Sequence, residues 1–250
     1  MLKLLKSIDQ LAVSEATPFG CKIRSAAAAY GMNEPSVQFW AQEGGPVVAR
    51  IDGQAVLEDG GKMDAEEIAA FLRTLGLESF ACSGEAARKL GLPVSARGEI
   101  MALGQAGAGE RPLADVVWNP GPREIYAVLE QARSEHFPVP EFEPFYMDLA
   151  FRTRHGAALT AGVRQGGRLV ACALCTALTR QAAVVSAVAC VPGLRRRGYG
   201  RAALAELARR LGRAHLYVFR ADGENEAFYR ALGFAACGRW AQARRKGETP

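Results

Sequence analysis

The chain has 250 residues, of which 49% are hydrophobic and 23% charged, and its formal net charge is +5 at pH 7. A chain of this length can bury a sizeable core in one or two domains. It contains no run of roughly eighteen apolar residues, which excludes a membrane-spanning helix, and its basic first segment lacks the features of a secretion signal. The six cysteines lie mostly in apolar sequence and indicate buried thiols in a reducing cytoplasm.

The two halves of the chain differ in charge. Residues 1–110 contain ten basic and fourteen acidic side chains, a net charge of −4, whereas residues 111–250 contain 21 basic and 12 acidic side chains, a net charge of +9. An excess of this size predicts an anionic partner for the second half.

The first half predicts a small α/β lobe. Three short apolar runs separated by glycine turns predict an antiparallel meander, which a helix, a short strand and a second helix follow. The strands are expected at 37–41, 46–51, 54–57 and 79–82, and the helices at 64–75 and 85–90. The small-residue stretch 104–112 predicts a linker, where we place the domain boundary.

The second half opens with a strand, two helices and a β-hairpin. These elements are expected at 113–118, 123–135, 142–154, 159–164 and 168–178, in that order. The two hairpin strands flank a Gln-Gly-Gly turn, which is a typical hairpin signal.

The segment 182–201 carries the strongest functional signal. A β-branched apolar run predicts a buried strand at 182–191, and the apolar stripe of Leu204, Leu207, Ala208 and Leu211 predicts a helix that begins near Tyr199. Between them stands an arginine-rich turn of the form R-x-x-G-x-G. Its glycines remove Cβ atoms that keep a phosphate from the backbone, and the first helical amides lack partners. This junction therefore predicts an anion site.

A strand at 215–219 and a helix at 225–234 follow, and the helix contains the pattern Y-x-x-L-G-F. The strand, the R-x-x-G-x-G turn, the helix, the next strand and Y-x-x-L-G-F together resemble the GNAT superfamily of N-acyltransferases, which use acetyl-CoA. The resemblance spans residues 112–245. It implies an α/β fold with a mixed, mostly antiparallel central sheet flanked by helices.

The order of elements in the first half repeats the later part of the second. We therefore expect two lobes in tandem: a degenerate GNAT-like N-terminal lobe at 1–110 and an acetyl-CoA-binding GNAT catalytic domain at 111–250. The strand-to-helix junction of the first lobe, 57–64, offers acids where a phosphate needs bases. We expect no CoA there.

The resemblance also implies cofactor-binding residues. The backbone of Val188, Ala189 and Cys190 is expected to pair with the pantetheine arm as an added strand would. Main-chain amides near Cys190 and Val191 are expected to polarise the thioester carbonyl. The residues expected to hold the diphosphate are Arg195, Arg196, Arg197, Gly198, Tyr199, Gly200 and Arg201.

Tyr229, the tyrosine of Y-x-x-L-G-F, is implied to be the general acid that protonates the leaving thiolate. An unperturbed phenol has a pKa of about 10, roughly matched to an alkyl thiol. Asn225 is implied to help orient the cofactor. Many family members carry that asparagine seven residues before the tyrosine, where this chain has Asp222.

The general base is missing from the strands, because no carboxylate occurs between Asp148 and Glu206. An ordered water, or a residue of the predicted helical region that precedes these strands, must then take the proton of the attacking amine. The candidates are Glu135, His136, Glu141, Glu143 and Asp148. Cys190 is disfavoured as a nucleophile, because no histidine lies close in sequence and apolar burial raises a thiol pKa.

Together these features predict an N-acetyltransferase that moves an acetyl group from acetyl-CoA to a primary amine by direct attack in a ternary complex. One alternative is a CoA-binding sensor or structural module without turnover, which the missing strand carboxylate favours. A nucleic-acid binder is disfavoured, because the arginines cluster at one helix start.

Cys172 and Cys175 form a C-x-x-C, but on a strand they face opposite sides, so we expect no metal site.

Overall fold

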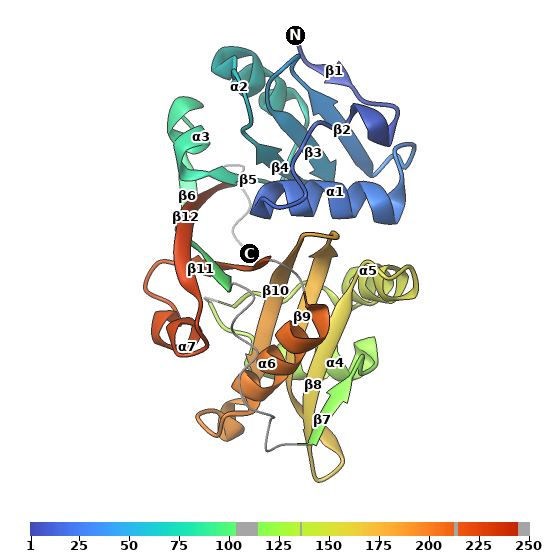
Figure 1. The fold of residues 1–250 in the computed structure, drawn as a ribbon, viewed down its shortest axis with the longest axis vertical. Helices are drawn as coiled ribbons and strands as arrows, with labels where there is room; N and C mark the ends of the chain where they lie inside the picture. Colours follow the sequence, from blue (N-terminus) through green and yellow to red (C-terminus); the bar gives the residue numbers. More distant parts are fainter. Residues whose placement is uncertain (104–114, 136, 213–214, 245–250) are drawn as a thin grey trace. The chain divides into compact units, whose positions relative to one another are not determined.

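The computed structural model describes residues 1–103, 115–135, 137–212 and 215–244. The chain forms two compact units (Figure 1). The first comprises Met1–Met101, Phe219–Glu226 and Ala236–Pro250, and the second comprises Ala102–Val218 and Ala227–Ala235. The linker predicted at 104–112 lies outside the described residues, so that boundary stays a prediction. No helix in the described ranges is long and apolar enough to cross a membrane.

The first unit is a mixed α/β fold whose sheet runs in the order β1-β2-β3-β4-β5-β12. All neighbours in it are antiparallel except β4 and β5, which run parallel. Its strands are β1 Lys3–Leu4, β2 Val37–Ala41, β3 Val47–Ile51, β4 Gln54–Glu58, β5 Ser79–Ser83, β6 Val94–Leu103 and β12 Ala235–Arg244. Its helices are the 3-10 turn η1 Ile8–Gln10, α1 Pro18–Tyr30, α2 Ala65–Thr74 and α3 Gly84–Lys89. The predicted meander and both predicted helices are confirmed.

Helix α1 is the main element of this unit that the sequence did not predict. It begins at a Thr17 cap, whose side chain accepts a hydrogen bond from the Gly20 amide, with Pro18 in the first turn. It ends at Gly31, where φ is 77°. Its alanine-rich sequence dilutes the apolar stripe, which explains why periodicity alone did not indicate it.

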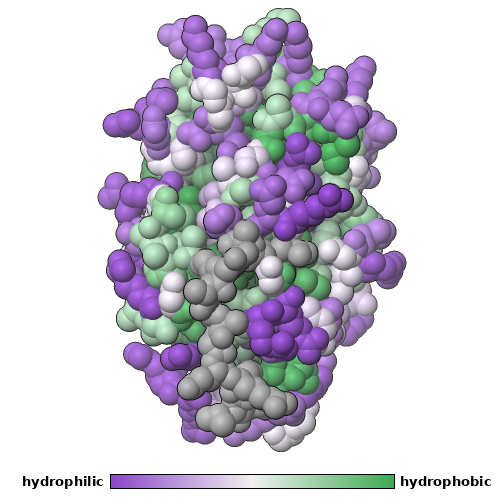
Figure 2. All heavy atoms as spheres, viewed as in Figure 1, coloured by the Kyte–Doolittle hydropathy of each residue, from purple (hydrophilic) through white to green (hydrophobic). Residues whose placement is uncertain are grey.

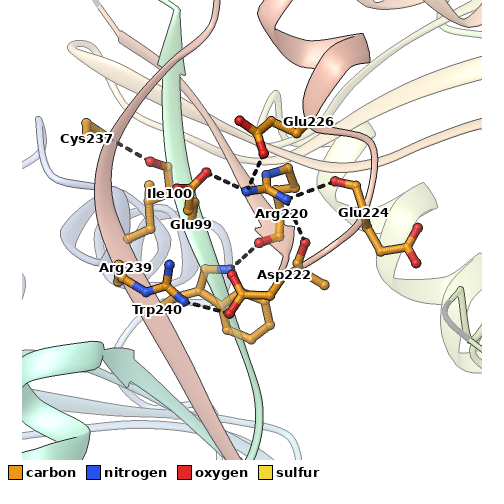
Figure 3. Close-up of polar contacts among 10 residues, drawn as sticks. Glu99, Ile100, Arg220, Asp222, Glu224, Glu226, Cys237, Arg239 and Trp240 are labelled. Atoms are coloured by element: carbon orange, nitrogen blue, oxygen red, sulfur yellow. Dashed lines mark hydrogen bonds and ion pairs between the residues drawn. The ribbon is translucent and has the colours of Figure 1, made fainter.

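A buried arginine organises the end of β11, His215–Ala221. The Arg220 guanidinium pairs with Glu99 and Glu226. The backbone carbonyl of Arg220 accepts a hydrogen bond of 3.0 Å from the indole Nε1 of Trp240 (Figure 3). A Cβ at Gly98 would overlap that carbonyl and the indole nitrogen. Glycine is therefore required where β6 passes this group.

The second unit has the sheet order β11-β10-β9-β8-β7, with only β10 and β11 parallel. Helix α6 contacts β8, β9 and β10 on one face, and α4 packs on β9 and β10 from the other (Figure 1). The strands are β7 Asp115–Trp118, β8 Leu159–Gln165, β9 Arg168–Leu178 and β10 Ala182–Cys190. The helices are α4 Pro122–Ala132, α5 Phe142–Arg154, the 3-10 turn η3 Pro192–Leu194, α6 Tyr199–Leu211 and α7 Glu226–Arg230. The predicted order of elements is confirmed.

The last helix is shorter than the 225–234 expected from sequence. Helix α7 ends at Arg230, and the amides of Gly233 and Phe234 fold back onto the carbonyls of Arg230 and Tyr229. Gly233 has φ of 91°, so the Leu-Gly-Phe part of the pattern forms a turn rather than helix.

The surface seen in Figure 2 is mostly hydrophilic, with apolar residues in small groups between charged ones. Inside the second unit, an apolar cluster joins α4 to the sheet through Ile125, Val128, Leu129 and Leu174, among others. Burial of these side chains supplies the main stabilising free energy of the unit.

The C-terminal part of α6 is held by one buried carboxylate. Glu206 pairs with Arg209 and Arg210 at 2.8 and 2.6 Å, and Arg210 lies over the Trp118 ring, 4.7 Å from its centroid. The hydrogen bond from Arg209, with further help from Arg210, lowers the pKa of Glu206 to about 2. The ion pairs therefore stabilise the last turns of α6, and the contact of Arg210 with Trp118 ties this helix to β7.

Glu206→Gln should lower the free energy of unfolding at pH 7 by about 1 to 3 kcal/mol. The folded pKa lies below the ordinary carboxyl value, so this contribution is complete above pH ~5 and is lost as pH falls toward 2. Urea titrations at several pH values measure it, with Glu85→Gln as the control, because the Glu85–Lys89 pair is exposed. If both variants lose equal stability with the same pH dependence, the structural role given to Glu206 is wrong.

Candidate functional site

Strand β10 leaves its parallel neighbour halfway along its length. It pairs with β11 at four positions, the last of which is Val185↔Val218, and then runs on to Cys190. Beyond Val185, Ser186 is exposed and Val188 is half-buried. The second half of β10 thus has an edge for which no pairing with β11 is found in the described residues.

The register against β9 decides which backbone groups lie on that edge. Val191 donates its amide hydrogen to the carbonyl of Val170 at 2.9 Å, and the preceding four residues stay in register with β9. Because facing residues of an antiparallel pair alternate between bonded and non-bonded positions, Ala189 presents its backbone to β9, whereas Val188 and Cys190 present theirs to the edge. The prediction that Val191 offers an unpaired amide is wrong, and the Cys190 amide is the better donor.

A bulge and a polar cluster mark the point where β10 leaves β11. The register against β9 shifts on either side of Val185, and the Ser186 hydroxyl hydrogen-bonds both the amide and the hydroxyl of Thr176. Arg152 of α5, which is buried, donates to the Thr176 carbonyl at 2.9 Å and to Asp148 at 2.8 Å. The sequence analysis did not identify this cluster, although Ser186 and Thr176 stand out as hydroxyls within apolar strands.

The turn after β10 leaves a row of backbone amides without acceptors. Arg195 is fixed by a hydrogen bond of 3.3 Å from its Nε to the carbonyl of Cys190. Arg196 and Gly198 take left-handed conformations, with φ of 64° and 84°, and Gly198 caps α6 without a side-chain hydrogen bond. In the part of the chain that the structure describes, no acceptor is found for the amides of residues 197–201. Such a row binds anions.

Charge and proximity support the same interpretation of this turn. Arg196, Arg197 and Arg201 are exposed, and the first turn of α6 carries no acidic residue to offset them or the helix dipole. A Cβ at Gly200 would lie 3.7 Å from Cγ1 of Val188, so the start of α6 packs directly beside the free edge. The structure therefore brings the predicted strand and turn residues together.

Tyr229 lies on α7 between two aromatic rings. Its ring contacts Phe228 and Phe234 edge-on, with centroids 5.1 and 5.6 Å away, and no hydrogen bond to its hydroxyl is found among the described residues. Burial raises the pKa of Tyr229 to about 12. This value is above the ordinary phenol pKa that the sequence argument used, because the anion is poorly solvated there. The hydroxyl is thus fully protonated at neutral pH.

Asn225 is not part of the helix that carries Tyr229. It precedes the first residue of α7 and has φ of 52°, a left-handed conformation that asparagine tolerates. The helix predicted at 225–234 therefore begins one residue later than expected, and the cofactor role of Asn225 stays a prediction.

The candidate bases differ in their surroundings. Asp148 is held by the ion pair with Arg152, whereas Glu135, Glu141 and Glu143 are exposed on the helical side. His136 lies outside the described residues. Of the candidate bases that the structure describes, three are exposed to solvent and the fourth, Asp148, is engaged by Arg152. None of them is therefore a buried carboxylate available to act as the base.

The cysteines near the site are poor nucleophiles. Burial raises the pKa of the Cys190 thiol, against a smaller opposing effect of Arg195, and burial raises that of Cys172 to about 12. No group of three or more potential metal ligands occurs in the described ranges.

A free strand edge that runs into the amide-lined start of a basic helix defines a fold suited to an extended thioester with a nucleotide end. Residues 123–234 match the model of the acetyltransferase (GNAT) family, so this part of the chain is similar to that family. The family and its fold imply acyl transfer from an acyl-CoA. Comparison with curated proteins gave no match.

Solved structures share the fold over most of the chain. A GCN5-related N-acetyltransferase from Kribbella flavida is 19% identical, with a TM-score of 0.64, and the match covers 91% of this chain and 96% of that one. A tandem GNAT protein from the clavulanic acid biosynthesis pathway is 13% identical, with a TM-score of 0.61 and coverage of 100% and 99%. A GCN5-related N-acetyltransferase from Sphaerobacter thermophilus is 14% identical, with a TM-score of 0.55, and the match covers 98% of this chain and 95% of that one. The predicted GNAT-like fold is confirmed.

Gly198→Ala should weaken binding of CoA by about tenfold or more, because alanine is strained in a left-handed conformation and the strain moves the amide row. Isothermal titration calorimetry with CoA measures the change. Gly212→Ala is the matched control, since Gly212 ends the same helix with φ of 51°, and it should leave CoA affinity unchanged within about twofold. An equal loss in both variants would place the effect in helix stability rather than in the turn.

Proposed function

We propose that this protein is an N-acetyltransferase that transfers the acetyl group of acetyl-CoA to a primary amine by direct attack in a ternary complex. The observation that carries the proposal is the continuity of two features. The backbone edge at Val188 and Cys190 is followed, after the turn of residues 191–196, by the amides of residues 197–201, for which the described residues offer no acceptor, and the start of α6 lies against Val188. An acyl-CoA is long enough to use both, with its amide-containing arm on the edge and its diphosphate on the turn.

In this arrangement each group has one task. The amine nitrogen attacks the thioester carbonyl carbon, the carbonyl oxygen becomes an oxyanion, and the Cys190 amide stabilises the negative charge. The carbon–sulfur bond then breaks, and the leaving thiolate takes a proton from Tyr229. The products are an N-acetyl amine and free CoA, and Tyr229 regains its proton from solvent.

The proton of the attacking amine has a separate route. Asp148 is engaged by Arg152 at 2.8 Å, which disfavours it as a base. The hydroxyls of Ser186 and Thr176 lie where β10 leaves β11, so a water bound to them is in place to accept the proton. This cluster also supplies polar groups that orient an amine.

Direct attack is favoured over an acyl-enzyme by the state of the nearest thiol. Burial raises the pKa of Cys190, and a protonated thiol is a weak nucleophile. The six cysteines are free, which supports action in the reducing cytoplasm.

Tyr229→Phe should lower kcat by about a hundredfold or more, because the leaving thiolate loses its proton donor, and should leave the Kd of CoA unchanged. Release of free thiol from acetyl-CoA over a panel of primary amines measures turnover, and calorimetry measures binding. Tyr126→Phe is the control, since its hydroxyl donates to the Pro140 carbonyl and is assigned no role in the reaction. Binding of CoA with no turnover on any amine in the unsubstituted protein would favour the sensor instead.

The alkaline side of the pH profile tests the state of Tyr229. With a folded pKa of about 12, the phenol stays protonated, and kcat should not fall through loss of this acid below pH ~10. A fall in kcat near pH 8 that Tyr229→Phe abolishes would contradict the assignment.

A further inference from the structure

Arg220, the buried arginine at the end of β11, holds the segment that leads from this strand into α7. Only 6% of its surface is exposed. Its Nη1 donates hydrogen bonds to the backbone carbonyls of Ala221 and Glu224, at 3.1 and 3.2 Å. Its Nη2 pairs with the carboxylates of Glu99 on β6 and Glu226 on α7 (Figure 3). One guanidinium therefore links the first residue of α7 to β11 and β6.

The backbone between the strand and the helix has a conformation that needs such support. Gly223 and Asn225 both take left-handed conformations, with φ of 83° and 52°, and asparagine is less favourable there than glycine. A residue in such a conformation persists when the surrounding contacts fix it. The two carbonyls that Arg220 bonds flank Gly223, so the guanidinium supplies part of these contacts.

Stability of the fold alone does not explain why this residue is an arginine. The Nε of Arg220 is buried and has no hydrogen-bond partner among the described residues, and an unsatisfied buried donor is unfavourable. A buried ion pair is often no more stabilising than apolar side chains of similar size. What arginine offers is geometry, because one of its nitrogens bonds two carbonyls while another pairs with two carboxylates. A lysine ammonium cannot make both sets of contacts at once.

Helix α7 depends on its attachments at both ends. It has only five residues, none of them fully buried, and so short a helix has little stability of its own. Its end is fixed where the amide of Phe234 donates to the carbonyl of Tyr229 at 3.1 Å. Its start is fixed by the pair between Glu226 and Arg220. Because Glu226 and Tyr229 lie on one short helix, a shift at its start moves the phenol.

We propose that Arg220 is a positioning residue, which sets the direction of α7 and thereby the place of the Tyr229 hydroxyl. This inference rests on the proposed function, in which Tyr229 protonates the leaving thiolate. A general acid must lie within hydrogen-bond reach of the atom that it protonates, and a misplacement of about 1 Å lowers the rate strongly. The contacts of Arg220 therefore act on turnover through Tyr229.

Arg220→Lys in the full chain tests the proposal. The kcat for thiol release should fall by about tenfold or more, because lysine loses part of the contacts that hold α7, whereas the Kd of CoA should change by less than about threefold. In the Tyr229→Phe background, the same substitution should lower kcat by less than about twofold, because the group that it displaces is already absent. Losses that multiply in the double variant would contradict the proposal.

The ionisation of Tyr229 gives a second readout, which does not depend on turnover. Burial holds the pKa of Tyr229 at about 12, so displacement of α7 in Arg220→Lys should expose the ring and lower this pKa by about one unit or more. NMR of the chain with ¹³Cζ-labelled tyrosine measures the onset of ionisation, and Tyr229→Phe assigns the signal. Glu226→Gln, a milder change, should shift the pKa in the same direction. Glu206→Gln removes a carboxylate from the ion pairs of α6 and should leave it unchanged.

The two readouts separate this proposal from the proposed function. An unchanged Tyr229 pKa in both Arg220→Lys and Glu226→Gln would overturn the positioning role, and so would an equal shift in Glu206→Gln. If the unsubstituted protein binds CoA but turns over no amine, the proposed function fails, and the pKa still decides whether Arg220 positions Tyr229. If circular dichroism shows that Arg220→Lys does not fold, Glu226→Gln serves in both measurements.

Discussion

The candidate site depends on one constraint, the loss of pairing between β10 and β11 after Val185. An inner strand of a sheet ordinarily uses the hydrogen-bonding groups of both edges. Here the amides and carbonyls of alternate residues from Val188 onward face away from β9, and such an edge is a template for another extended chain. Recognition of an acyl-CoA arm can then come from main-chain groups, which any sequence with this register supplies.

Charge is distributed along α6 in a way that fits this edge. At its C-terminal end, Arg209 and Arg210 both pair with Glu206, so those cations stabilise the fold. At its N-terminal end no acid is present in the first turn, and the exposed Arg196, Arg197 and Arg201 stand near one another in sequence and near the positive end of the helix dipole. Their mutual repulsion is unfavourable in the free protein. A bound diphosphate removes it, so this term favours the complex over the free state.

Local periodicity allowed most helices and strands to be predicted, because buried faces repeat with period two or 3.6. The anion-binding turn was also predictable, since glycines and arginines at a strand-to-helix junction act through nearby backbone. Three features depended on distant contacts. The register with Val170 engages the Val191 amide, burial raises the pKa of Tyr229, and the bulge brings Ser186 to Thr176. None of these is encoded within a short window of sequence.

The two units show that the backbone alone does not select the ligand. Each has an antiparallel meander followed by a parallel neighbour that pairs over only a few positions, three for β4 with β5 and four for β10 with β11. After β10 the chain offers arginines and free amides, whereas β4 ends in Glu58 and Asp59. The residues that directly follow the first strand of each parallel pair are therefore acidic in the first unit and basic in the second. Since Coulomb energy grows with each added charge, a diphosphate is favoured only at the second opening.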